Sequence, residues 1–240
     1  MKIMTWNILA NEFIKKSYYP MISKKHLFNR ENRKTQIITI LTTVDTDIML
    51  LQEVMQSEYN LLINYFNKTH YIIRGKNIKW QQQKHYSGNV ILVRKTQFKL
   101  PHKIITLDFG VGLMCSYKNA PLLILNLHLD DLSHHTRMKQ VSELIPHLQA
   151  NNKIIMGGDF NENYKSTASS ELYNLIKSMG LNIKNKKPTY YIEGQLCIDN
   201  IMTKGIELNH NVAHVLNYFG RDKLKQYISY GSDHLPVLIN

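Results

Sequence analysis

The 240-residue sequence contains only two cysteines, Cys115 and Cys197, which are too few for a disulfide framework. Both lie in or beside strand-like apolar segments, so we expect small core residues in a reducing compartment. The chain also lacks the roughly 18 consecutive apolar residues that a membrane-spanning helix needs. Its N-terminus lacks the uninterrupted apolar core of a signal peptide, because Asn7 and Asn11 interrupt it. We therefore expect an intracellular protein of the cytoplasm or nucleus with no membrane partner.

Several diagnostic motifs are absent as well. The sequence has no Walker A segment, no paired-glycine dinucleotide motif and no Gly-x-Ser-x-Gly elbow, which argues against the enzyme classes built on them. It has no internal repeat, no low-complexity tract and no linker rich in proline or glycine. A chain of this length without a linker predicts one domain over residues 1–240, and we expect a monomer.

Acidic residues are scarce relative to basic ones. The chain has 18 Asp and Glu against 30 Lys and Arg, for a formal net charge of +12. Such a surface attracts polyanions, so nucleic acid or a phosphorylated molecule is the first candidate for a partner. The alternative is a basic protein whose charge serves solubility alone. Two loops, at 75–88 and 217–230, combine basic and aromatic residues and are candidate substrate walls.

The apolar pattern alternates between strands and amphipathic helices. Ile37, Ile40, Leu41 and Val44 lie at helical spacing, and further helices are predicted at 57–66, 136–150 and 172–179. Strands are predicted at 2–6, 47–51, 89–94, 103–107, 111–117, 122–127 and 153–156, with a hairpin around Gly194. About ten strands with four or five helices suggest two packed sheets with helices outside.

Polar side chains gather where the predicted strands end, most clearly at Asp233-His234. The full set is Asn7, Glu53, His128, Asp130, Asp159, Asn161, Asp199, Asp233 and His234. Hard oxygen donors without a thiolate cluster favour Mg²⁺ or Mn²⁺ over structural zinc. With a basic surface, the set predicts metal-assisted attack of water on a phosphodiester. Structural alternatives stay open for Asn7 as a turn former, His128 as a buried histidine and Asp199 as a buried hydrogen-bonding acid.

Seven short segments occur in a recurrent order. They are Met4-Thr5-Trp6-Asn7-Ile8-Leu9-Ala10, Leu51-Gln52-Glu53-Val54, Gly88-Asn89-Val90-Ile91-Leu92, Asn126-Leu127-His128-Leu129, Gly158-Asp159-Phe160-Asn161, Ile198-Asp199-Asn200-Ile201 and Ser232-Asp233-His234. In this order they resemble the motifs of the endonuclease/exonuclease/phosphatase superfamily, which has the DNase I-like fold. The resemblance spans nearly the whole chain. It implies a four-layer α/β sandwich in which two mixed β-sheets pack face to face with helices outside.

The resemblance also implies residue roles around a metal ion. Glu53 would be the principal ligand, with Asn7 beside it and Asp233 on the metal side. Asp159 would orient or deprotonate the attacking water, and Asn161 would position the scissile phosphate.

Imidazole groups complete the implied catalytic set. His234 would bind a phosphate oxygen, and Asp199 would hold its ring and favour the charged imidazolium. His128 would lie near the leaving group as a candidate acid.

The resemblance leaves the substrate open between nucleic acids and smaller phosphoesters. The N-terminal half resembles the deadenylase, nocturnin and 2′,5′-phosphodiesterase branch, through Tyr19-Pro20 and Arg33-Lys34 among others. The C-terminal half departs from that branch at Asp199-Asn200 and is more similar to bacterial nuclease-phosphatases or tyrosyl-DNA phosphodiesterases. The candidate substrate-binding residues are Trp80, Lys84, Tyr86, Arg137, Tyr218 and Arg221.

The sequence therefore predicts a Mg²⁺-dependent phosphodiesterase acting on RNA or DNA, such as a 3′-exoribonuclease or a 2′,5′-phosphodiesterase. Three alternatives remain: a tyrosyl-DNA phosphodiesterase or an enzyme that cuts at abasic sites, an inositol-phosphate-type phosphomonoesterase, and an inactive nucleic-acid-binding module.

Overall fold

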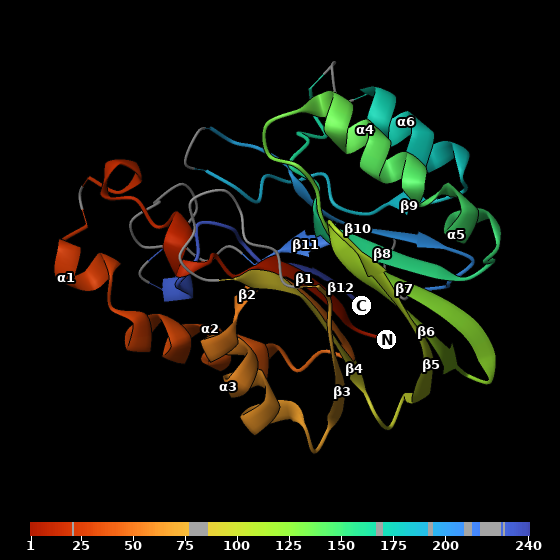
Figure 1. The fold of residues 1–240 in the computed structure, drawn as a ribbon, viewed down its shortest axis with the longest axis horizontal. Helices are drawn as coiled ribbons and strands as arrows, with labels where there is room; N and C mark the ends of the chain where they lie inside the picture. Colours follow the sequence, from red (N-terminus) through yellow and green to blue (C-terminus); the bar gives the residue numbers. More distant parts are fainter. Residues whose placement is uncertain are drawn as a thin grey trace.

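Two β-sheets pack face to face at the centre of the protein (Figure 1). A computed structural model describes residues 1–20, 22–76, 86–166, 170–191, 194–208, 213–216, 227 and 229–240. Within these residues each sheet has six strands. The first runs in the order β11 (His214–Val215), β12 (Val237–Ile239), β1 (Ile3–Asn7), β2 (Ile48–Met55), β4 (Ser87–Arg94) and β3 (His70–Arg74). The second runs β5 (Phe98–Leu107), β6 (Gly110–Tyr117), β7 (Ala120–His128), β8 (Ile154–Asp159), β10 (Asp199–Lys204) and β9 (Asn182–Ile183).

Each sheet is mixed, with one parallel pair near its centre. Strand β1 lies parallel to β2, and β7 lies parallel to β8, while their other pairings are antiparallel. Helix α2 (Arg30–Val44) connects the first pair, and α4 (His134–Glu143) with α5 (Ile145–Gln149) connects the second. Parallel strands joined by helical crossovers end at the same edge. The two pairs end on the same side of the molecule, because Asn7 at the end of β1 hydrogen-bonds Asp159 at the end of β8.

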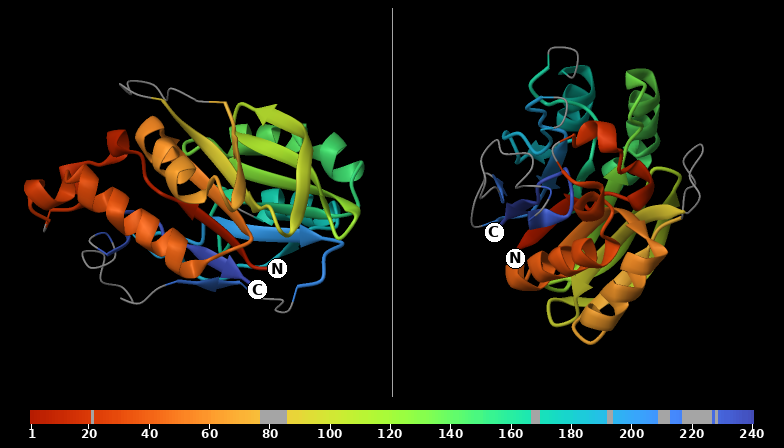
Figure 2. Two further views of the ribbon diagram at one scale, coloured as in Figure 1. Left: turned by 90° about the horizontal axis from the view of Figure 1, so that it is seen from below. Right: turned by 90° about the vertical axis from the view of Figure 1, so that its left-hand side faces the viewer.

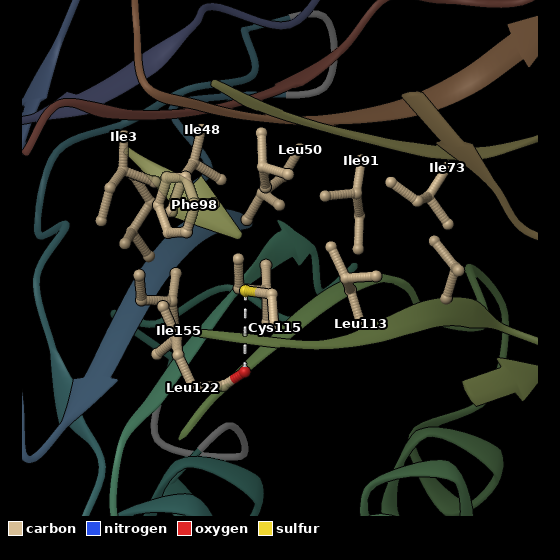
Figure 3. Packing of buried hydrophobic residues seen from close by; sticks show 14 of the residues in the cluster. Ile3, Ile48, Leu50, Ile73, Ile91, Phe98, Leu113, Cys115, Leu122 and Ile155 are labelled. Carbon is tan, nitrogen blue, oxygen red and sulfur yellow. Dashed lines mark hydrogen bonds between the residues drawn. The ribbon is translucent and has the colours of Figure 1, made fainter. Parts of the chain in front are cut away.

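Helices cover the outer faces of both sheets. Figures 1 and 2 show α2 and α3 (Gln56–Phe66) over the first sheet, with α4, α5 and α6 (Ser170–Ser178) over the second. The apolar residues between the sheets form a continuous core that includes Leu50, Ile91, Leu113 and Ile155 (Figure 3). Each helical layer has an apolar cluster of its own against its sheet. This arrangement confirms the expected four-layer α/β sandwich.

Both cysteines lie in the fold as expected. Cys115 is in the core between the sheets, where its thiol points toward the Leu122 carbonyl oxygen at 3.8 Å (Figure 3). Cys197 is also fully buried, and both thiols are free. Burial raises the pKa of each thiol to about 12.

Several element boundaries differ from the sequence prediction. The single helix expected over 136–150 is two helices, α4 and α5, because Pro146 cannot donate a backbone hydrogen bond. The strand expected at 153–156 runs on to Asp159 through Gly157 and Gly158. The hairpin around Gly194 is reduced to an isolated bridge between Tyr190 and Leu196. The segment between β1 and α2 contains the short helices η1 (Asn11–Phe13), η2 (Lys16–Tyr18) and α1 (Lys24–Leu27).

The two glycines of β8 are required by close packing. A Cβ on Gly157 would lie 2.7 Å from the Leu50 side chain of the opposite sheet. A Cβ on Gly158 would lie 1.9 Å from the Leu127 carbonyl oxygen, and its φ is +149°. Glycine alone allows this approach and this backbone conformation. The segment Asp159-Phe160-Asn161 that follows is thereby held against β7 and close to the opposite sheet.

Among the described residues, no helix is both long enough and apolar enough to cross a membrane.

Candidate active site

Glu53 lies on a distorted segment of β2. The pairing between β2 and β4 shifts register between Leu51 and Val54, and Glu53 has a φ of +56° within this irregularity. A bulge of this kind redirects a side chain out of the regular alternation of a strand. The Glu53 carboxylate accepts hydrogen bonds from the Asn7 amide at 2.8 Å and from the Ala10 backbone NH at 2.6 Å. Burial raises the pKa of this carboxyl above its usual 4.5.

Asn7 connects the carboxylates of two different sheets. Its Nδ2 donates to Glu53 and also, at 3.1 Å, to Asp159 Oδ2 at the end of β8. Its Oδ1 accepts from the Leu9 backbone NH at 3.0 Å. Its backbone carbonyl accepts the Ser232 hydroxyl at 2.8 Å. The side chain of Asn7 is therefore fixed between the strand ends of both sheets.

His128 lies opposite these carboxylates. The register of β7 and β8 pairs His128 with Asp159. Its Nε2 lies 4.0 Å from Glu53 Oε1 and 3.8 Å from Asp159 Oδ2. An imidazolium at this position would neutralise part of the negative charge of the pair.

His234 and Asp199 form a buried pair beside Asp159. The Nδ1 of His234 lies 2.9 Å from Asp199 Oδ2, and its Nε2 lies 3.7 Å from Asp159 Oδ2. Burial disfavours the charge on His234, but the carboxylates of Asp199 and Asp159 outweigh it and raise the pKa of His234 well above 6.5. Burial raises the pKa of Asp199 as well, against the attraction of His234. The tyrosine ring of Tyr190 packs against the imidazole at 4.9 Å between centroids.

Asn161 follows Asp159 in a left-handed conformation, with a φ of +48°. Its backbone NH donates to Asp159 Oδ1 at 2.9 Å, and its side-chain amide donates to the Leu129 carbonyl at 2.9 Å. Leu9 and Glu53 also have positive φ angles. Backbone strain of this kind persists where surrounding contacts enforce it, and it concentrates at functional sites.

Among the described residues, no hydrogen bond or ion pair joins the Asp233 side chain to this cluster. This half-buried side chain lies beside Tyr19, whose pKa is raised by burial and by the neighbouring Asp233 charge. Asp130, in the original set of strand-end acids, accepts the backbone NH groups of Leu132 and Ser133 before α4. Among the described residues, no hydrogen-bond donor to Glu53 or Asp159 also donates to Asp130 or Asp233.

Arg137 is buried and makes contacts within the protein. Its Nε lies 2.5 Å from Glu162 Oε2, and its Nη1 donates to the Asp130 carbonyl at 2.9 Å. This guanidinium holds the loop after Asn161 against α4, an arrangement different from the substrate contact expected of it. Tyr86 is 53% exposed next to β4. Trp80, Lys84, Tyr218 and Arg221 lie outside the described residues.

Arg33 is a site-supporting residue, although we identified it in the sequence only through the resemblance carried by Arg33-Lys34. It is only 3% exposed and donates to the carbonyls of Ile8, Leu9 and Gly231. The Nη2 bond to Leu9 is 2.6 Å long. Arg33 thereby links the segment after Asn7 to the segment before His234. A signal was present in the sequence, because Arg33 continues the apolar stripe of Ile37 one helical turn earlier.

Two further polar residues support the site from below. Gln52 Nε2 donates to Asn126 Oδ1 at 2.6 Å and to Thr5 Oγ1 at 3.1 Å. Asn126 Nδ2 in turn donates to the backbone of Leu51 and Val90. This network joins the two sheets at Gln52, the residue before Glu53, and fixes their relative position there.

A divalent cation suits the donor set. Glu53 and Asp159 are buried carboxylates that share one amide donor, and two such charges are stable together only with nearby positive charge. Ligand atoms of Asp159, Asp199 and His234 also lie within 4.8 Å of one another. His234 Nδ1 is already engaged by Asp199, however, so the Glu53–Asp159 side offers the better oxygen ligands.

A family model for the endonuclease/exonuclease/phosphatase family matches residues 4–234. The chain belongs to this family. Enzymes of the endonuclease/exonuclease/phosphatase family hydrolyse phosphoester bonds and generally depend on divalent metals. No curated protein matches the sequence.

Solved structures with the same fold cover nearly the whole chain. ANGEL2, described as a 2′,3′-cyclic phosphatase, is 15% identical with a TM-score of 0.77, covering 99% of this chain and 93% of its own. The human nocturnin catalytic domain is 17% identical with a TM-score of 0.71, covering 100% and 93%. D. rerio TDP2 in complex with a single-strand DNA product is 14% identical with a TM-score of 0.66, covering 100% and 97%. At these identities the likeness establishes the fold.

Proposed function

We propose that this protein is a Mg²⁺- or Mn²⁺-dependent phosphodiesterase that hydrolyses nucleic acid. The observation that carries the proposal is the meeting of Asn7, Glu53, Asp159 and His234 at one edge, from strand ends of both sheets and from the segment before β12. These residues are separated by up to 227 positions in the sequence, yet Asn7 donates to both Glu53 and Asp159, and His234 Nε2 lies 3.7 Å from Asp159 Oδ2.

Glu53 would hold the cation, with Asn7 keeping the carboxylates of Glu53 and Asp159 in place. When bound, the cation would stabilise negative charge on the phosphate and favour ionisation of water. The raised pKa of Glu53 in the protein alone accords with this role, because a buried carboxylate gains most from a cationic partner.

The remaining side chains would manage the proton and the phosphate charge. Asp159 would accept the proton of the attacking water, since its Oδ1 is oriented by the Asn161 NH. His234 would donate from Nε2 to a non-bridging phosphate oxygen, in the imidazolium state that Asp199 favours. His128 would protonate the leaving oxygen, and Asn161 would contact the scissile phosphate.

The net charge of +12 supports a polyanionic substrate. The solved structures with this fold include a complex of TDP2 with a single-strand DNA product and a 2′,3′-cyclic phosphatase, and DNA and 2′,3′-cyclic phosphates both contain phosphodiester linkages. The second candidate function is an inositol-phosphate-type phosphomonoesterase, which would use the same catalytic core.

The test compares Glu53→Gln with the wild-type chain on end-labelled single-stranded RNA and DNA, with Mg²⁺ and with EDTA. We expect turnover to fall at least about a hundredfold in the variant and to vanish in EDTA. Glu143→Gln, at an exposed glutamate on α4, is the matched control and should retain full activity. Circular dichroism should show the same fold in all three proteins.

A substrate panel separates the alternatives. It contains poly(A), 2′,5′-oligoadenylate, RNA ending in a 2′,3′-cyclic phosphate, 5′-tyrosyl DNA, abasic duplex and inositol phosphates. Activity on inositol phosphates alone would refute the nucleic-acid assignment. Metal-independent binding of oligonucleotides without any product would identify an inactive binding module.

A further inference from the structure

The segment after Asn7 forms a small structural unit of its own. We define the N-terminal arm as residues 10–20 and 22–30, which include η1, η2 and α1. It begins at the active site, where the Ala10 NH donates to Glu53 at 2.6 Å. It then extends beyond the sheets at the end where β1 and β2 finish, on the far side of the molecule from β5 (Figures 1 and 2).

The arm has a separate apolar core. Leu9, Ile14, Tyr19, Ile22 and Leu27 are buried together with Tyr227 from the C-terminal part of the chain. The Tyr19 and Tyr227 rings lie 4.6 Å apart, and the Tyr227 hydroxyl donates to the Leu27 carbonyl at 2.9 Å. These contacts attach the arm to the body of the protein.

Internal hydrogen bonds also order the arm. The Lys16 ammonium donates to the carbonyls of Tyr19, Pro20 and Ile22. The Ser23 side chain accepts the His26 NH and caps the start of α1. The backbone is therefore held in place, and the outward side chains project from a fixed surface.

The outward face of the arm is basic and aromatic. The exposed basic side chains are those of Lys15, Lys24, Lys25, His26 and Arg30, and the exposed aromatic ones are Tyr18 at 39% and Phe28 at 48% exposure. Among the described residues, no carboxylate lies within ion-pair distance of Lys24, Lys25 or Arg30, whereas Lys34 pairs with Glu31 at 2.8 Å. Unpaired cations interleaved with exposed rings are the combination that binds single-stranded nucleic acid, through phosphates and stacked bases.

We propose that the N-terminal arm is a docking surface for a single-stranded nucleic acid whose scissile linkage occupies the catalytic edge. The inference rests on the proposed nuclease function, since it names the substrate class of the same site. Lys24, Lys25 and Arg30 contact phosphates outside the catalytic centre, and Phe28 stacks on a base. The arm thereby favours long strands over small diesters.

The main test uses the full chain with Lys24→Glu, Lys25→Glu and Arg30→Glu combined. Binding of a fluorescent single-stranded 20-nucleotide oligomer is measured in EDTA at several salt concentrations. The logarithm of the association constant K falls linearly with the logarithm of the salt concentration. The loss of three phosphate contacts should make this slope less steep by about 2. The kcat/KM for the oligomer with Mg²⁺ should fall at least about tenfold, while turnover of bis(p-nitrophenyl) phosphate is retained.

The matched control reverses three exposed lysines at the distant edge, Lys99, Lys103 and Lys118. It changes the net charge equally and should leave oligomer binding within about twofold of wild type. A separate Phe28→Ala variant should bind about fivefold or more weakly, at an unchanged salt slope.

Four outcomes overturn the proposal: wild-type binding by the arm variant, equal losses in both triple variants, loss of small-diester turnover in the arm variant, or arm-dependent binding to phosphatidylserine vesicles with unchanged oligomer binding. Failure of the nuclease assignment is distinguishable. In that case no phosphodiester is cleaved by the wild-type chain, while the EDTA binding measurements still report on the arm.

Discussion

Replacing Asp199 with asparagine removes the charge behind His234 while preserving the shape of the side chain. The Asp199–His234 hydrogen bond is 2.9 Å long and buried, and a charged bond of this kind contributes about 1.5–3 kcal/mol. If the hydrogen bond stabilises the transition state by that energy, the kcat/KM of Asp199→Asn should be roughly 10- to 150-fold below that of the wild type at neutral pH. Stability should change little, because the variant also removes a buried carboxylate whose Oδ1 has no hydrogen-bond partner among the described residues.

The pH profile identifies the cause of this loss. Asp199 and Asp159 raise the pKa of His234, so the imidazolium is fully present below pH 6.5 and is lost as the pH rises through the raised pKa. Without the Asp199 charge that pKa falls, and the alkaline limb of kcat/KM should move to lower pH. The ratio of the wild-type kcat/KM to that of Asp199→Asn should therefore be smaller under acidic conditions.

The assay measures kcat/KM on a single-stranded oligonucleotide between about pH 5 and 10 with saturating Mg²⁺. Asp130→Asn is the matched control, because Asp130 accepts two backbone NH groups away from the catalytic cluster. It should keep the wild-type profile. The reasoning is refuted if Asp199→Asn lowers activity by the same factor at every pH with the alkaline limb in its original place.

Two further predictions concern stability. Gly158→Ala should destabilise the protein by about 3 kcal/mol or more in urea unfolding, since its Cβ would overlap the Leu127 carbonyl at a φ of +149°. Gly194→Ala, with its nearest neighbour at 3.9 Å, should cost only about 1 kcal/mol, and equal losses would contradict the packing argument. Arg33→Met should leave three buried carbonyls without a donor and cost about 3 kcal/mol or more, whereas Arg30→Met on the exposed side of α2 should be neutral. An unchanged melting temperature for Arg33→Met would show that this guanidinium does not support the site.

The alternation of strands and amphipathic helices made the layered α/β architecture predictable. A continuous apolar run such as that of β2 is stable only where both of its faces are buried, as they are inside a covered sheet. The apolar face of the helix around Ile37 is buried by packing against such a sheet. The prediction failed where a local residue altered a long pattern, as Pro146 does between α4 and α5. It also failed at Gly158, where a neighbouring strand supplies the hydrogen bonds that carry β8 onward.

The chemical inventory of the site was likewise visible in the sequence. Carboxylates, amides and imidazoles at strand ends are rare enough, and ordered enough, to indicate the family and its phosphoester chemistry. Arg137 shows the limit of this reasoning. A basic residue near a catalytic strand is equally suited to phosphate and to a carboxylate of its own protein, and only its contact with Glu162 distinguishes the two.

The sequence by itself determined which groups this protein can bring to a reaction and which layers it can fold into, because both follow from residue type and periodicity. Only the tertiary structure decided that the amide of Asn7 lies between Glu53 and Asp159, that Asp233 turns toward Tyr19, and that Arg33 joins the two ends of the chain. The physical reason is that these contacts join residues far apart in the sequence. Their geometry depends on sheet order, strand register and a bulge, which no local pattern encodes.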